Sequence, residues 1–322
     1  MHRTFRVAVL PLCAVLLVGV AAPAGAATAS WRMRFPTPRP SARWYQAQSS
    51  DPAMDGIVLF GGFGGHFLSD TWLWSDGRWR LLHPAHHPTA RANAGMAYDS
   101  PSGDLVLFGG FDGHRRLGDT WTFDGTDWHR QQPAKSPPRG TGPSLFPDPR
   151  SGRVDEYGGF DGQFYQLQTW RWRSDQRTWR RVFTKTSPWA RSAAVAALDP
   201  VRHEVVLFGG IADVNPNNTW TFDGSDWTMR DPAHQPPQTW GAATAFDPVI
   251  GKVVSYGGGS PGGQLDDTWE WTGSDWKLLA ASNPPVAREG ARVSYDPELG
   301  RLVMFGGSIG NTFTRQFWTL RA

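Results

Sequence analysis

Residues 105–128, which read LVLFGGFDGHRRLGDTWTFDGTDW, decide the fold of this chain. They contain a short apolar run, a Gly-Gly pair, a polar loop, a run with a central Trp, and an Asp-Gly turn that leads to a second Trp. The pattern occurs six times, with Gly-Gly pairs that begin at Gly61, Gly109, Gly158, Gly209, Gly257 and Gly306. The pairs are 48 to 51 residues apart, so the chain is a tandem array of units of about 50 residues.

Each unit is predicted to form four short strands, called a to d in chain order. Strand a ends at an Asp turn, strand b is the apolar run, and strands c and d each have a recurring Trp. The two glycines permit positive φ where neighbouring sheets crowd together. Such a sheet buries little surface alone, so we expect an all-β, six-bladed propeller of four-stranded blades.

The sixth unit has no strand d of its own, because only four residues follow Trp318. Trp31 lies 30 residues before Gly61, just as Trp79 lies 30 residues before Gly109. We therefore predict that an N-terminal strand near residues 31–34 completes the last blade. Closing the ring in this way removes exposed strand edges, which would otherwise favour aggregation.

Residues 1–26 have the pattern of a secretory signal peptide. Arg3 and Arg6 precede an apolar stretch that ends in small residues. We therefore expect an exported protein in which residues 27–322 form a single propeller domain. No later segment is apolar enough for a membrane span. Cys13 is the only cysteine and belongs to the signal, so the mature chain has no thiol ligand for a metal.

Composition limits the class of protein and of partner. Eighteen Trp and 37 Gly, with 19% charged residues, exclude a disordered chain and a coiled coil. Without residues 1–26 the chain has 30 basic and 29 acidic side chains, and its arginines are scattered. We therefore expect no nucleic-acid partner, and we expect a monomer.

The chain resembles the kelch-repeat family, and specifically the propeller of galactose-oxidase-like secreted proteins, over about residues 29–322. The resemblance rests on the six Gly-Gly pairs and on the two Trp positions of each unit. It implies the fold and leaves the activity open. A copper-radical oxidase of the galactose oxidase type needs a Tyr joined to a Cys, which the mature chain lacks. No metal and no cofactor are therefore expected.

The connections from b to c and from d to a differ between the units, whereas the turns at the opposite face are stereotyped. Variable loops on a rigid scaffold commonly carry the binding site, so we expect a ligand at that face. The candidate residues in the b-to-c loops are His66, Phe67, Asp112, His114, Asp161, Phe164 and Tyr165.

An arginine recurs just before strand a, at Arg43, Arg91, Arg139, Arg191 and Arg288, and the fifth unit has Thr239 there. These arginines either satisfy buried carbonyl and acidic groups or form a ring of guanidinium groups that binds an acidic glycan. Three further residues, Trp44, Trp189 and Trp240, are not needed by the repeat. They either pack against a neighbouring blade or form an aromatic platform for a ligand.

Two neighbouring acids interrupt the apolar strand b of the third unit. Asp155 and Glu156 stand where the second unit has Val106 and Leu107. Buried charges need partners, and Arg153 or Arg171 could supply them. We interpret the third blade as an irregular part of the scaffold.

Three functions follow as hypotheses. The leading one is a secreted module that binds a glycan or cell-wall component at the variable-loop face. A sugar-acting enzyme of the epimerase or isomerase type is the second, with Glu289 as acid/base and Arg288 holding a sugar carboxylate. A scaffold that binds another exported protein is the third.

Overall fold

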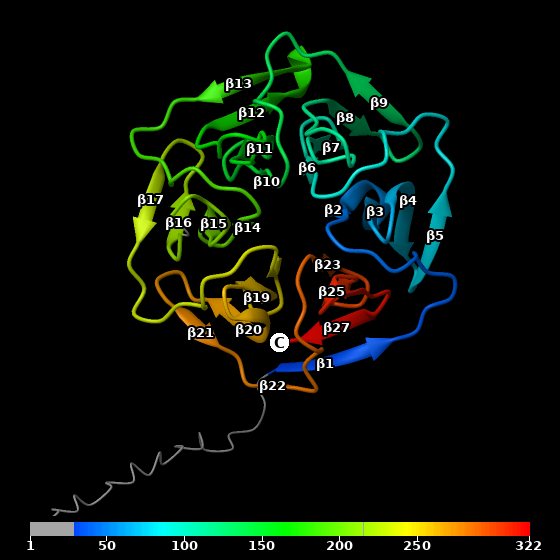
Figure 1. The fold of residues 1–322 in the computed structure, drawn as a ribbon, viewed down its shortest axis with the longest axis vertical. Helices are drawn as coiled ribbons and strands as arrows, with labels where there is room; N and C mark the ends of the chain where they lie inside the picture. Colours follow the sequence, from blue (N-terminus) through cyan, green and yellow to red (C-terminus); the bar gives the residue numbers. More distant parts are fainter. Residues whose placement is uncertain (1–28, 215) are drawn as a thin grey trace, which may run out of the picture.

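The computed structural model describes residues 29–214 and 216–322, which form a six-bladed β-propeller (Figure 1). The signal peptide predicted for residues 1–26 lies outside the described residues. Within the described residues, no helix is long and apolar enough to cross a membrane. Two short 3-10 turns, η1 (Pro52–Met54) and η2 (Ser174–Gln176), are the only helical segments there.

The first five blades each consist of four consecutive antiparallel strands, with strand a innermost and strand d outermost (Figure 1). Blade 1 contains β2 (Ala47–Asp51), β3 (Gly56–Phe63), β4 (Phe67–Ser75) and β5 (Arg78–Leu82). Blade 2 contains β6 (Gly95–Asp99), β7 (Asp104–Phe108), β8 (Thr120–Phe123) and β9 (Trp128–Gln131). Blade 3 contains β10 (Ser144–Pro147), β11 (Val154–Tyr157), β12 (Thr169–Arg173) and β13 (Thr178–Val182).

Blade 4 contains β14 (Val195–Asp199), β15 (Glu204–Phe208), β16 (Thr219–Phe222) and β17 (Trp227–Arg230). Blade 5 contains β18 (Ala243–Asp247), β19 (Lys252–Ser260), β20 (Gly263–Trp271) and β21 (Trp276–Leu278). Blade 6 contains β23 (Arg292–Asp296), β24 (Arg301–Phe305), β27 (Phe317–Arg321) and β1 (Ala29–Arg34). The short strand β22 (Ala281–Ser282) pairs with β1, and β25 (Ser308–Ile309) and β26 (Thr312–Phe313) form a small hairpin.

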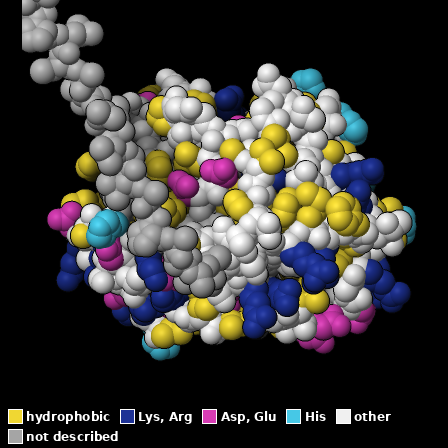
Figure 2. Space-filling model, turned by 90° about the horizontal axis from the view of Figure 1, so that it is seen from below, with side chains coloured by type: hydrophobic (Ala, Val, Ile, Leu, Met, Phe, Trp, Pro, Cys, Tyr) yellow, Lys and Arg dark blue, Asp and Glu magenta, His cyan; other side chains and the backbone are white. Residues whose placement is uncertain are grey.

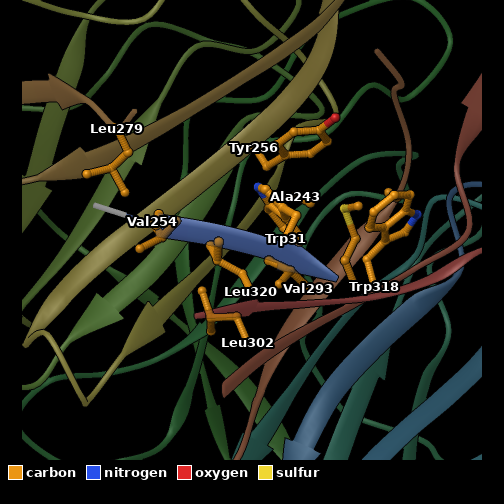
Figure 3. Close-up of a cluster of buried hydrophobic side chains, with 12 residues drawn as sticks. Trp31, Ala243, Val254, Tyr256, Leu279, Val293, Leu302, Trp318 and Leu320 are labelled. Carbon is orange, nitrogen blue, oxygen red and sulfur yellow. The ribbon is translucent and has the colours of Figure 1, made fainter. Parts of the chain in front are cut away.

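The N-terminal strand closes the ring, as predicted. β1 pairs antiparallel with β27 from Ser30 opposite Arg321 to Arg34 opposite Phe317. Trp31 is buried in a cluster that joins blades 5 and 6, and its ring centroid lies 4.9 Å from that of Tyr256 (Figure 3). The two ends of the chain thus share one sheet.

The strand d tryptophans also link each blade to the preceding one. In five interfaces the indole N–H donates to a strand c threonine over 2.9 to 3.1 Å: Trp31 to Thr268, Trp128 to Thr71, Trp179 to Thr120, Trp227 to Thr169 and Trp276 to Thr219. In the sixth interface, Phe317 occupies the threonine position and the Trp79 indole has no hydrogen-bond partner. Aromatic packing replaces the bond there, with ring centroids 5.9 Å apart.

The Gly-Gly pairs bring adjacent blades into backbone contact. Both glycines of every pair have positive φ. The Gly62 N–H donates to the Arg91 carbonyl of the next blade over 2.8 Å, and a Cβ on Gly61 would lie 2.7 Å from that oxygen. Only glycine combines this conformation with so close an approach.

The outer edge of the ring carries charges of both signs. Figure 2 views one side of this edge and shows basic, acidic and hydrophobic side chains interspersed over it. Such mixing is typical of a solvent-facing surface and does not by itself indicate a binding site.

Candidate ligand-binding face

A closed ring of six backbone hydrogen bonds surrounds the central channel on the face of the b-to-c and d-to-a connections, here called the loop face. The residue two positions before each strand a has positive φ, and its N–H donates to the equivalent carbonyl of a neighbouring blade over 2.7 to 3.0 Å. The six residues are Tyr45, Asn93, Gly142, Ala193, Gly241 and Gly290. The ring makes the centre of this face rigid.

The ring and the Tyr45 side chain leave little space in the channel. A Cβ on Gly241 would lie 2.6 Å from the Tyr45 hydroxyl, and the Arg292 guanidinium lies 5.4 Å from the centre of the Tyr45 ring. Burial raises the pKa of Tyr45 and lowers that of Arg292. The cavity beside Arg292 is only about 120 Å³, enough for a few waters of about 30 Å³ each but not for an oligosaccharide.

Seven aromatic side chains and one arginine form an arc around this centre, on blades 6, 1, 2 and 3. The aromatic arc consists of Trp44, Phe313, Phe63, Phe67, Phe111, Phe160 and Tyr165. Successive ring centroids lie 4.7 to 5.9 Å apart, from Trp44 with Phe313 to Phe67 with Phe111 and again from Phe160 to Tyr165. The Arg116 guanidinium bridges the one gap, 5.4 Å from Phe111 and 5.2 Å from Phe160. All seven rings are partly exposed.

Three of the predicted aromatic residues, Trp44, Phe67 and Tyr165, are thus brought together in the arc. Trp189 is 56% exposed and Phe164 is 61% exposed, and among the described residues neither ring forms an aromatic pair with an arc member. Trp240 is not a member of the arc, and its indole N–H donates to Glu289 over 3.0 Å.

The polar candidates of the b-to-c loops have different roles. His66 and His114 are exposed at the loops. The Asp112 carboxylate accepts the backbone N–H groups of His114 and Arg115, at 2.9 and 2.8 Å. Asp161 accepts two backbone N–H groups in the same way, at 2.8 Å each. Both aspartates therefore shape their own turns.

Four of the recurring arginines hold their blades together. Arg43, Arg91, Arg191 and Arg288 are buried, and each donates to the carbonyl of the first glycine of its own blade's pair. Arg43 also binds both oxygens of Asp70, and Arg91 binds both oxygens of Asp119. These guanidinium groups do not reach a ligand at the loop face.

Arg139 does not belong to this set. The comparison of the units had placed it at the recurring arginine position, which the structure assigns to the next residue, so this prediction was wrong by one residue. Gly140 takes the equivalent place, because its carbonyl accepts the Gly110 N–H over 2.8 Å as the Arg91 carbonyl accepts that of Gly62. The shift leaves the Arg139 side chain exposed.

The proposed catalytic pair is separated. The half-buried Glu289 carboxylate accepts the Trp240 indole N–H over 3.0 Å, and burial raises its pKa. The adjacent Arg288 is buried and donates instead to the Gly306 carbonyl and to Gln316, the latter over 2.7 Å. Arg288 therefore cannot hold a substrate carboxylate next to Glu289.

Sequence reasoning missed four members of the arc and the whole backbone ring. Phe63, Phe111 and Phe160 directly follow their Gly-Gly pairs, so a comparison of the units could have singled them out. The backbone ring left a weaker signal in the sequence than these phenylalanines did. Three of its six residues are glycines and one is an asparagine, the residue types that most readily adopt the left-handed conformation.

Comparison with known proteins gives no match, either to a protein-family model or to a curated protein. Over residues 29–214 and 216–322, no group of three His, Cys, Asp or Glu side chains is placed to hold a metal ion. The fold and the face define a six-bladed β-propeller with an aromatic arc beside a narrowed channel.

Proposed function

We propose that this chain is an exported propeller of the kelch type that binds a glycan on its loop face. The export proposal rests on residues 1–26, and the kelch proposal rests on the six Gly-Gly and Trp repeats. The aromatic arc carries the binding proposal.

The arc suits a chain of sugar rings. Sugar rings have apolar C–H faces, which pack on the faces of aromatic rings, while their hydroxyl groups need polar partners. The arc offers partly exposed rings on four successive blades, so contacts extend over more than one sugar unit. Rigid aromatic anchors lose little conformational entropy on binding.

Polar groups flank the arc. The Glu289 carboxylate is held by the Trp240 indole, and both side chains stay partly exposed at the rim of the channel. A fixed carboxylate next to a partly exposed indole presents an acceptor for sugar hydroxyl groups. A hydrogen bond to a charged acceptor contributes about 1.5 to 3 kcal/mol, and the aromatic contacts supply the rest of the affinity.

Binding to a panel of oligosaccharides tests this function. We expect Phe67→Ala and Tyr165→Ala each to weaken binding of the best glycan at least tenfold, which is about 1.4 kcal/mol. Isothermal titration calorimetry measures the affinity. The matched control is Phe183→Ala, because Phe183 is 81% exposed and is not in the arc.

Two outcomes would contradict the proposal. Unchanged affinity in both arc variants would exclude the arc as the binding surface. Failure of the wild type to bind any glycan would favour the protein-binding scaffold instead.

A further inference from the structure

A pocket of about 360 Å³ opens over blade 2, next to the aromatic arc. Four arginines from three segments line it: Arg115 and Arg116 in the loop between β7 and β8, Arg130 in β9, and Arg139 in the connection to blade 3. Because the Arg116 guanidinium also lies over Phe111 and Phe160, the pocket continues the arc.

The acidic residue that lines this pocket is already bound. Asp119 accepts two hydrogen bonds from the buried Arg91, at 2.7 and 2.9 Å, and a third from the Trp121 indole. Against the effect of burial, these bonds lower the pKa of Asp119. Its charge is therefore neutralised inside the blade.

Three of the four arginines keep their charge available. In the described part of the chain, no carboxylate oxygen lies within 4 Å of Arg116, Arg130 or Arg139, whereas Arg115 lies 3.5 Å from Asp112. The Nε of Arg116 is buried without a hydrogen-bond partner. Backbone hydrogen bonds, and after them the charges of Arg139 and Arg116, lower the pKa of Asp161, so this carboxylate offsets part of the positive charge from a distance. The remaining positive charge of the pocket favours binding of an anion.

The backbone places Arg139 at the pocket through two features of this blade. Gly140 takes the structural position that arginine holds in four other units, so Arg139 is released to the surface. A Cβ on Gly118 would lie 2.9 Å from the Cβ of Arg139, so glycine makes room for it. The other five units have Ser69, Leu167, Asn217, Asp266 and Arg315 at this position.

We infer that this pocket binds an anionic substituent, a carboxylate or a sulfate, of the glycan that packs against the arc. The inference rests on the proposed function and specifies its ligand as an acidic glycan. Planar guanidinium groups bind carboxylate and sulfate oxygens through paired N–H donors, which lysine does not offer.

The test measures the affinities of three oligosaccharides of equal length: a sulfated heparin fragment, an oligogalacturonate with carboxylates only, and a neutral cello-oligosaccharide. We expect at least one anionic probe to bind tenfold more tightly than the neutral one. We expect Arg130→Gln combined with Arg139→Gln, two pocket arginines that are not part of the arc, to remove this preference and to leave neutral binding unchanged.

The matched control combines Arg78→Gln with Arg180→Gln, two exposed arginines of the outer strands β5 and β13. It changes the net charge equally, so it should retain the preference. Thermal melting checks that both double variants are folded. If both double variants lost the preference for anionic probes equally, the preference would reflect net charge, and the proposed anion site in this pocket would be wrong.

The remaining outcomes separate the two proposals. Equal binding of neutral and anionic probes would overturn the pocket and leave glycan binding intact. Absence of binding by all three probes would overturn glycan binding itself. Equally tight binding of a single-stranded DNA of the same charge would show a general polyanion site and contradict the glycan assignment.

Discussion

At the residue scale, two buried acids in β11 show how a departure from the repeat is tolerated. Asp155 forms an ion pair with Arg171 at 2.7 Å, and Arg171 is one of the two partners that the sequence predicted. Arg171 also binds the buried Asp148. Arg153 pairs with Asp175 instead. Glu156 is buried with no basic group within 4 Å among the described residues. Burial raises the pKa of Asp155 to about 7 and that of Glu156 well above its usual value.

These raised pKa values predict a loss of stability as the pH rises. An acid with a raised folded pKa contributes its full stability below its unfolded pKa of about 4, and loses it as the pH rises through the folded pKa. We expect the free energy of unfolding in urea to fall from about pH 4, near the unfolded pKa, to about pH 7, the folded pKa of Asp155. Glu156→Gln should raise this free energy at pH 8 by at least about 1 kcal/mol, because position 156 then carries no ionisable group.

The control is Glu298→Gln, an exposed glutamate, which should not alter the profile. Asp70 and Asp119 have the opposite effect on the free energy of unfolding, which they lower as the pH falls into the acidic range. Against the effect of burial, Arg43 and Arg91 lower the pKa values of these two acids, so their contribution is lost below about pH 4. A wild-type profile that is flat from pH 5 to pH 7 would contradict the raised pKa values of the two acids in β11.

At the scale of the element, β1 decides whether the ring is closed. This strand has six residues, yet it supplies the outer strand of blade 6 and one side of the interface with blade 5. The Trp31 indole N–H donates to Thr268 of blade 5 over 3.1 Å. A terminal strand that is held by pairing and by a buried tryptophan contributes to global stability rather than fraying.

Truncation of Trp31 tests this closure. Trp31→Ala should lower the free energy of unfolding by about 3 to 5 kcal/mol, because it leaves a cavity between two blades. The exposed neighbour gives the control, and Arg32→Ala should change stability by about 0.5 kcal/mol or less. Deletion of residues 29–34 should abolish cooperative thermal unfolding, and an unchanged melting curve would refute the closure.

At the scale of the whole molecule, the backbone ring links all six blades through one set of hydrogen bonds. Its residues Tyr45, Asn93 and Ala193 adopt φ values of 50° to 56°, which cost about 1 to 2 kcal/mol each for residues with a Cβ. The left-handed conformation persists because each ring residue donates its N–H to one neighbouring blade and accepts an N–H from the other at its carbonyl.

Alanine substitution at two glycines separates backbone strain from crowding at the ring. Gly77 and Gly241 both have positive φ, but a Cβ meets no atom within 4 Å at Gly77 and meets the Tyr45 hydroxyl at 2.6 Å at Gly241. Gly77→Ala should cost about 1 kcal/mol in urea unfolding, and Gly241→Ala clearly more. The excess should disappear when Tyr45→Ala is added, and equal costs in the two single variants would contradict crowding at the ring.

The fold was largely predictable because its signals are local and repeated. The Gly-Gly pairs, the paired tryptophans and the missing last strand indicated six blades and the closing role of Trp31. The site was predictable only in part, since Trp44, Phe67 and Tyr165 do lie in one arc. Arg139 was misaligned because a shift of one residue is visible only once the start of β10 is known.

The sequence by itself determined the propeller, the number of its blades and the strand that closes it, because these follow from periodic patterns within each unit. Only the tertiary structure decided which side chains are available to a ligand. Arg288 and Glu289 are adjacent in the chain but bind different partners, Gln316 and Trp240, and Arg91 is buried whereas Arg139 is exposed. The physical reason is that burial and hydrogen bonding depend on neighbours brought from segments far apart in the chain.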